Sequence, residues 1–106
     1  MDLTQHIYQV TDRFPIKEQY GLSNQIQRAA VSITSNIAEG AARHSKKEFI
    51  QFLYIAKGSL SELDTQLELA KRLEYVRDTE WETLNERLER VDRMLSGLIR
   101  HLRAKS

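Results

Sequence analysis

The feature that most constrains the fold is a pair of long apolar seams in the second half of the chain. Residues 45–75 and residues 79–102 each carry apolar side chains that recur in alternating steps of three and four. The seam residues are Phe49, Leu53, Ala56, Leu60, Leu63, Leu67 and Ala70 in the first segment, and Trp81, Leu84, Leu88, Val91, Leu95, Leu98 and Leu102 in the second. Such spacing places them on one face of an α-helix. Because only a few residues separate the two segments, the sequence predicts an antiparallel helical hairpin.

The first half of the chain predicts two more helices. The apolar residues of the first are Leu3, Ile7, Val10 and Phe14. Pro15 ends it, because the residue before a proline is biased away from helical backbone. The second runs from about Leu22 to Ala42, and Ser23 or a neighbour can cap it. Its buried stripe is Leu22, Ile26, Ala29, Ala30, Ile33 and Ile37. Small residues crowd this stripe, so we expect a neighbouring helix to approach closely.

Two capping-box spacings predict where the last two helices begin. Ser45 with Glu48, and Thr79 with Glu82, have the arrangement that satisfies two free backbone donors at a helix start. The third helix should therefore run from Ser45 to about Tyr75, and the fourth from Thr79 nearly to the end of the chain. The prediction is an all-α, up-and-down four-helix bundle in a single domain, residues 1–106.

Composition limits the classes of protein that fit. With 106 residues, a partner chain could supply a significant share of the buried surface. The absence of cysteine excludes disulfides, thiolate metal sites and cysteine nucleophiles. The N-terminal segment "MDLTQHIYQV" lacks the pattern of a signal peptide, and no apolar run is long enough to span a bilayer. The expectation is a cytoplasmic protein with no membrane partner.

The residues that could carry chemistry are scattered. His6, His44 and His101 lie in three different segments, and none has a second ligand at metal-binding spacing. The four glycines are isolated, so there is no phosphate-binding loop, and the serines have no matched base. The sequence therefore predicts no catalytic residues, no metal, no cofactor and no small-molecule substrate. We expect a protein that is not an enzyme.

The third helix has more apolar residues than one face can bury. Ile55, Leu69 and Leu73 fall well away from its seam but align with one another at helical spacing. Scattered exposed apolar residues are normal on any protein surface. Three in one stripe favour a second contact surface, and we interpret them as candidates for a subunit interface.

Charge is unevenly distributed although the net charge is only +1. Residues 78–86 carry a net charge of −4, and residues 87–106 carry +4. Acidic residues at a helix start and basic residues at its end stabilise the helix, which is one explanation. The other is a basic surface that contacts phosphates, enlarged when several subunits gather. No aromatic platform for base stacking is evident. The candidate contacts are Arg28, Arg43, Lys46, Lys47, Arg90, Arg93, Arg100 and Arg103.

The segment "SNIAEG", residues 35–40, combines packing and polar residues. Ile37 joins the core stripe, and Gly40 on the same side suits close helix approach. Asn36 falls at the boundary, where its amide could bond a neighbouring helix or subunit. Glu39 lies on the polar side. Asn36 and Glu39 are therefore candidates for subunit contact.

The residues from Phe14 to Tyr75 resemble a known family. The runs "RAAVSI-SNIAEG" and "EF--FL-IA-GSL-EL-TQL" are similar to the bacterial four-helix-bundle proteins named for intervening sequences in 23S rRNA genes. That group includes accessory variability proteins of diversity-generating retroelements. The resemblance implies a left-handed bundle that assembles as a homopentamer without catalytic activity.

The resemblance leaves the binding partner open. For retroelement members it implies binding to a reverse transcriptase and to nucleic acid through a basic surface. For members from ribosomal RNA genes it implies only an association with those genes. Retroelement members tend to be clearly basic, whereas this chain is nearly neutral. Two hypotheses follow: an oligomeric module that binds RNA or a reverse transcriptase, and an assembly that contacts only protein.

Overall fold

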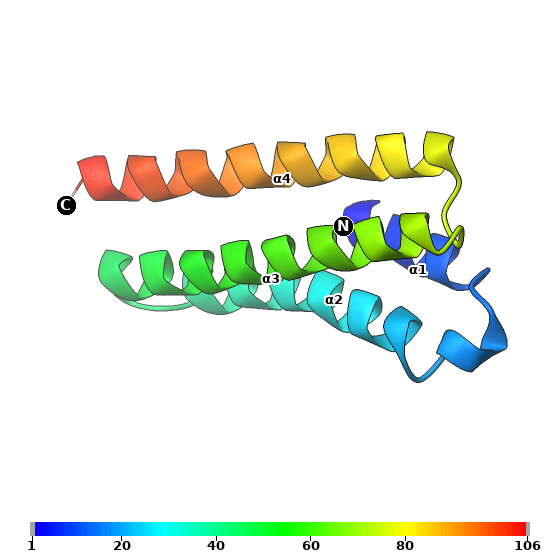
Figure 1. The fold of residues 1–106 in the computed structure, drawn as a ribbon. Coiled ribbons are helices and arrows are strands. Elements are labelled where there is room, and N and C mark those ends of the chain that lie inside the picture. Colours follow the sequence, from blue (N-terminus) through cyan, green and yellow to red (C-terminus); the bar gives the residue numbers. More distant parts are fainter. Residues whose placement is uncertain (1, 106) are drawn as a thin grey trace.

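The structure is a computed structural model that describes residues 2–105. Its elements are, in order, α1 (Asp2–Thr11), a short 3-10 helix η1 (Ile16–Glu18), α2 (Leu22–Ala41), α3 (Lys46–Arg72) and α4 (Asp78–Ala104). Within the described residues every regular element is helical. Figure 1 shows the three long helices lying side by side with α1 among them. The predicted all-α four-helix bundle is confirmed.

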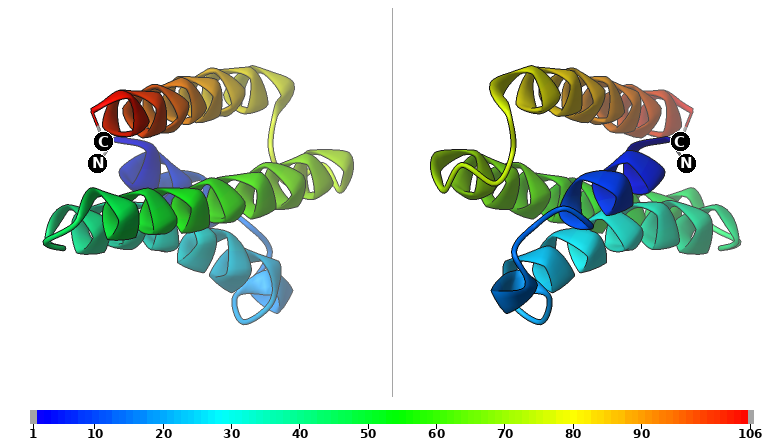
Figure 2. Two further views of the ribbon diagram at one scale, coloured as in Figure 1. Left: turned by 90° about the vertical axis from the view of Figure 1, so that its left-hand side faces the viewer. Right: turned by 90° about the vertical axis from the view of Figure 1, so that its right-hand side faces the viewer.

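The helices differ in how closely they pack. The contact of α2 with α3 is the most extensive, and α4 packs on α3 and, more lightly, on α1. Figure 2 shows α2 and α4 on opposite sides of the bundle, with α1 and α3 between them. Because α3 packs on both α2 and α4, its seam supplies more of the buried apolar residues than any other helix does.

The predicted seams form the core. Leu53, Leu63 and Leu67 of α3 are fully or almost fully buried, as are Leu84 and Leu95 of α4. The last turns of α4 differ from the prediction. Their buried residue is Ile99, while the predicted seam residues Leu98 and Leu102 are only partly buried against the core.

The start of α3 follows the sequence prediction. The hydroxyl of Ser45 accepts a hydrogen bond from the backbone N–H of Glu48 at 3.1 Å, as an N-cap residue should. At the start of α2 the N-cap is Gly21, which has no side chain that could cap the helix. Ser23 is buried inside the helix instead. The cap of α2 is therefore a neighbour of Ser23 and not Ser23 itself.

The predicted capping box at Thr79 is wrong. The N-cap of α4 is Arg77, and no side chain caps this end. The carbonyl of Arg77 already accepts a hydrogen bond from the backbone N–H of Trp81 at 2.8 Å. Thr79 therefore lies within the first helical turn and not at the N-cap, so its side chain does not cap the helix.

The end of α3 also differs from the prediction, which extended the helix to Tyr75. Glu74 adopts a left-handed backbone conformation with φ 65°. The N–H of Tyr75 then bonds the carbonyl of Ala70, and the N–H of Glu74 bonds that of Lys71, each at 2.9 Å. This is the Schellman arrangement, in which a left-handed residue satisfies the last free carbonyls of a helix. The helix therefore stops at Arg72.

Aromatic and polar contacts hold the connector after α1. The helix ends at Thr11, short of Phe14, which is buried outside the helix. The rings of Phe14 and Tyr75 lie 5.3 Å apart between centroids. The Tyr75 hydroxyl donates a hydrogen bond of 2.8 Å to Glu18 of η1, and this bond raises the pKa of the tyrosine. Phe14 thus belongs to the core through the connector and not through α1.

Close approach of α2 and α3 is confirmed at two points. The hydroxyl oxygens of Ser32 and Ser59 lie 2.8 Å apart across the two helices. A Cβ atom placed on Gly40 would lie 2.8 Å from the Cβ of Phe52 and 2.9 Å from Cδ1 of Phe49. Only glycine fits at position 40, because real Cβ atoms do not approach other heavy atoms so closely.

The short helix α1 covers only one half of the bundle. It has 10 residues against the 27 residues of α3 and of α4. At the rise of an α-helix these lengths correspond to roughly 15 Å and roughly 40 Å. Gln27 donates a hydrogen bond to Thr11, which places α1 beside the first half of α2. Beyond α1, the apolar residues Ile37, Leu98 and Leu102 pack against the core and are only partly buried.

Candidate nucleic-acid interface

Two basic segments that are distant in the sequence meet at one end of the bundle. The ammonium group of Lys46, at the start of α3, donates a hydrogen bond of 3.0 Å to the carbonyl of Lys105, just past α4. Figure 1 shows this end on the left, where α4 finishes beside the turn between α2 and α3, and the left panel of Figure 2 turns this side toward the viewer. We call this region, residues 43–47 and 100–105, the basic end.

The basic end holds a local excess of positive charge. Its basic residues are Arg43, Lys46, Lys47, Arg100, Arg103 and Lys105, and all six are exposed. The acidic residues nearest in sequence are Glu39 and Glu48, so six cations stand against two carboxylates. The net charge of the chain is nearly neutral, yet positive residues outnumber acidic ones at this end of the bundle.

Aromatic rings lie under two of these arginines. The guanidinium carbon of Arg43 lies 4.9 Å from the ring centroid of Phe52, and that of Arg103 lies 5.4 Å from that of Tyr54. Arg43 also forms an ion pair with Glu39 one turn back. The structure thus places two aromatic rings, Phe52 and Tyr54, beside cations of the basic end, which the sequence did not indicate.

Three of the predicted phosphate contacts lie elsewhere. Arg90 and Arg93 precede Arg103 on α4 by three to four helical turns, roughly 20 Å and roughly 15 Å along the helix axis. Arg28 lies on α2, about 20 Å along the helix from Arg43. It lines a separate hollow of about 350 Å³ between α2 and α3, together with the carboxylate of Glu62. The structure therefore groups five of the eight predicted cations and separates these three from them.

The candidate contact residues of α2 make local interactions. The amide of Asn36 donates to the backbone oxygen of Ser32 at 2.8 Å and to its hydroxyl at 3.1 Å. Within the chain the amide therefore bonds its own helix, and only the Ser32 hydroxyl reaches Ser59 of α3. Contact of Asn36 with another subunit stays a prediction. Glu39 is exposed and pairs with Arg43.

The predicted interface stripe of α3 is exposed in the isolated chain. Ile55, Leu69 and Leu73 expose 51%, 47% and 46% of their surfaces. The three side chains therefore offer apolar surface that the chain itself does not cover.

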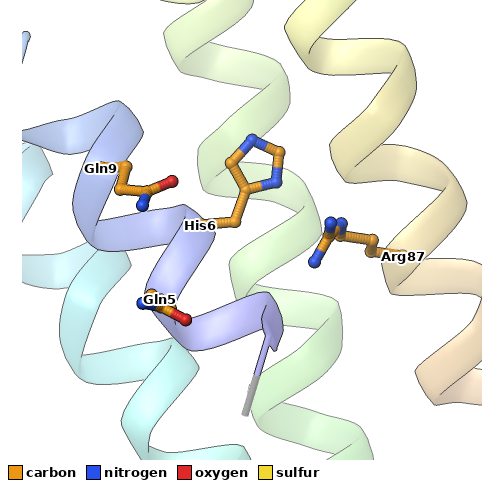
Figure 3. A pocket seen from close by; sticks show the side chains of 4 residues that line it. All are labelled: Gln5, His6, Gln9 and Arg87. Atoms are coloured by element: carbon orange, nitrogen blue, oxygen red, sulfur yellow. The ribbon is translucent and has the colours of Figure 1, made fainter.

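A second hollow, of about 320 Å³, lies between α1 and α4. Gln5, His6, Gln9 and Arg87 line it, and Figure 3 shows Arg87 reaching from α4 toward His6. Burial lowers the pKa of His6, and the nearby Arg87 and Arg13 lower it further against the opposing charge of Glu80. The four lining residues supply two amides, one imidazole and one guanidinium, and no carboxylate.

The lowered pKa of His6 predicts a loss of stability in acid. The folded protein binds this proton less readily than the unfolded chain, so the stabilisation is complete above the ordinary pKa of about 6.5. It is lost as the pH falls below that value toward the folded-state pKa. We expect the free energy of unfolding of His6→Gln to depend less on pH between about 5 and about 7 than that of the wild type. Denaturant titrations across this range measure it.

The control for this prediction is His101→Gln, at an exposed position near the end of α4. The change in pH dependence that this variant shows measures the effect of losing a histidine outside the hollow. Equal pH dependence in the His6→Gln variant and the wild type would show that His6 has no part in it.

Neither metal-binding clusters nor membrane spans occur in the part of the chain that the structure describes. Among residues 2–105 no three histidine or acidic side chains come together in a way that could hold a metal ion. No described helix combines the length and the apolar character needed to cross a bilayer.

The sequence matches a family model over most of its length. The model for the 23S rRNA-intervening sequence protein covers residues 1–97. The chain belongs to this family. The resemblance in the sequence from Phe14 to Tyr75 is therefore confirmed, and the match extends into α4.

A solved structure supports the assignment of this chain to the 23S rRNA-intervening sequence family. The fold is similar to that of a protein of unknown function from the S23 ribosomal protein family of Bacteroides thetaiotaomicron, whose crystal structure was determined at 1.70 Å resolution. The TM-score is 0.82, the sequence identity is 28%, and the match covers 92% of each chain. No curated protein matches the chain significantly.

Proposed function

We propose that this member of the 23S rRNA-intervening sequence family is a non-catalytic binding protein that contacts RNA phosphates through its basic end. The observation that carries the proposal is the hydrogen bond from Lys46 to Lys105, which joins two basic segments at one end of the bundle. Arginine and lysine side chains gain affinity for RNA by displacing the counterions of its phosphates. An exposed group of six such residues suits that role.

Helix stabilisation explains only part of the basic end. Arg100 and Arg103 lie in the last turns of α4, where a positive charge complements the helix dipole. Lys46 and Lys47 occupy the first turn of α3, where the same dipole disfavours a positive charge. Since the lysines work against the stability of their own helix, a contact with an anionic partner explains them better.

We further propose that the protein acts as a homopentamer, as the family resemblance implies. Two apolar surfaces support association. One is the stripe of Ile55, Leu69 and Leu73, and the other is the partly buried pair Ile37 and Leu98. A closed ring would repeat the basic end in every subunit, and gathered positive surfaces attract a polyanion more strongly than one copy does.

The test is a matched pair of charge-removing variants. Arg100→Gln with Arg103→Gln should weaken binding of a single-stranded RNA by about tenfold or more. It should also reduce the slope of log affinity against log salt by about 1.4, as expected for two lost phosphate contacts. Fluorescence anisotropy between about 50 mM and about 200 mM salt gives both quantities.

The control is Arg90→Gln with Arg93→Gln, which removes two charges from the same helix outside the basic end. We expect a smaller loss of affinity from it. Equal losses from the two pairs would show that charge acts without regard to position. A wild-type protein that purifies without nucleic acid and binds no RNA at low salt would favour the alternative, a structural or protein-interaction assembly that does not bind nucleic acid.

A further inference from the structure

Tyr54 gives the basic end a feature beyond its charge. This residue of α3 exposes 45% of its surface, although the guanidinium of Arg103 lies over its ring at 5.4 Å. Lys46, two turns earlier on α3, bonds the backbone just past α4. The ring is therefore placed among cations and stays open to solvent.

The other aromatic ring of the basic end is less open. Phe52 is partly buried, and the space beside Gly40 on α2 is filled by Phe49 and Phe52. The guanidinium of Arg43 covers one face of Phe52 at 4.9 Å. Phe52 is therefore committed to the contact between α2 and α3, whereas Tyr54 has surface to offer a ligand.

We propose that Tyr54 is a stacking platform for an unpaired base, so that the basic end binds single-stranded RNA in preference to duplex RNA. The inference rests on the proposed function. Bases in a duplex are stacked on one another, and only unpaired bases offer a free face to a protein ring. An aromatic ring set in a basic groove binds single strands because the ring takes the base while the cations take the phosphates.

The position of Arg103 favours this use of Tyr54. A guanidinium over a ring holds it by cation–π attraction and by contact with the ring face. The same guanidinium lies close enough to the ring to attract the phosphate that accompanies a stacked base. Arg103 then holds the ring on which the base stacks and also attracts the phosphate of the same nucleotide.

The test compares Tyr54→Leu with the wild type on three probes: a single-stranded oligouridylate, an RNA duplex with the same number of phosphates, and an abasic oligomer of the same length. Leucine keeps helix propensity close to that of the wild type and removes only the aromatic ring. We expect Tyr54→Leu to lower affinity for the single strand by about tenfold. Affinity for the duplex and for the abasic oligomer should stay at the wild-type value.

Tyr8→Leu is the matched control, because Tyr8 on α1 is also 45% exposed and lies outside the basic end. It should bind all three probes as the wild type does. A Tyr54→Trp variant adds a direct readout, since stacking of a base on the new indole should quench its fluorescence with the single strand and not with the abasic oligomer.

The outcomes separate this inference from the proposed function. A wild type that binds RNA, with Tyr54→Leu unchanged on the single strand, would overturn the stacking platform and leave the phosphate contacts standing. Equal losses on all three probes would show that Tyr54 acts only by supporting the cations, which also overturns it. A wild type that binds none of the probes would overturn both proposals.

Discussion

Replacing Gly40 by Ala is expected to destabilise the fold by about 1–3 kcal/mol, the usual cost of inserting a methyl group into a fully packed site. The new Cβ would lie 2.8 Å from the Cβ of Phe52 and 2.9 Å from the ring of Phe49. The ring can rotate, but the Cβ of Phe52 is bonded to the backbone of α3, so the helices must move apart. Denaturant unfolding at a fixed protein concentration measures the change.

The control is the same substitution at Gly58 on α3, where an added Cβ meets nothing within 4 Å. Here alanine should stabilise the helix by up to about 1 kcal/mol, because glycine is the poorer helix former. The two changes are chemically identical and should have opposite signs. If Gly40→Ala were as stable as Gly58→Ala, the close approach of α2 and α3 would not limit packing at Gly40.

Helix faces could be predicted because burial follows the helical repeat. Ile26, Ile33, Leu53 and Leu67 are buried as the spacing predicts, since a helix turns each seam toward one side. The close approach that follows from short side chains was also predictable, as the pairing of Ser32 and Ser59 illustrates. These features depend on local geometry, which the sequence carries directly.

Helix ends were less predictable because they depend on neighbouring contacts. Glu74 takes a left-handed conformation that the sequence does not suggest, since glycine or asparagine is usual there. Buried Val76 and the half-buried ring of Tyr75 tie the following loop to the core. Thr79 has a suitable spacing for a cap, yet the chain has already entered α4 when it reaches that residue.

The candidate site was partly predictable. Charge alone identified Lys46, Lys47 and Arg103, but the sequence could not tell that Arg28 lies far from them, because their grouping depends on how the helices align. Tyr54 was missed for the same reason. In the run "FIQFLYIA" it is one apolar residue among many, and only the fold brings Arg103 over its ring.

For the proposed homopentamer, replacing both Leu69 and Leu73 by Glu is expected to reduce the mass of the particle from about five times 12.4 kDa toward that of a single chain. Leu69 lies in the last turn of α3 and Leu73 is the C-cap residue of that helix, and the two are 47% and 46% exposed in the isolated chain. In an interface each would be covered by a neighbouring subunit. A carboxylate placed there loses its hydration without a partner, which costs several kcal/mol per group. Light scattering coupled to size-exclusion chromatography measures the mass.

Met94→Glu is the matched control, since Met94 is 49% exposed but lies on α4, away from the stripe. It introduces one carboxylate, where the double variant introduces two, and should leave the mass unchanged. Circular dichroism should show wild-type helix content in both variants, because half-exposed positions tolerate glutamate in a helix.

A double variant that keeps the wild-type mass would place the interface elsewhere, with the partly buried residues Ile37 and Leu98 as the next surface to test. A wild type that is itself monomeric would contradict the proposed homopentamer. The basic end would then have to bind RNA with the six cations of one chain.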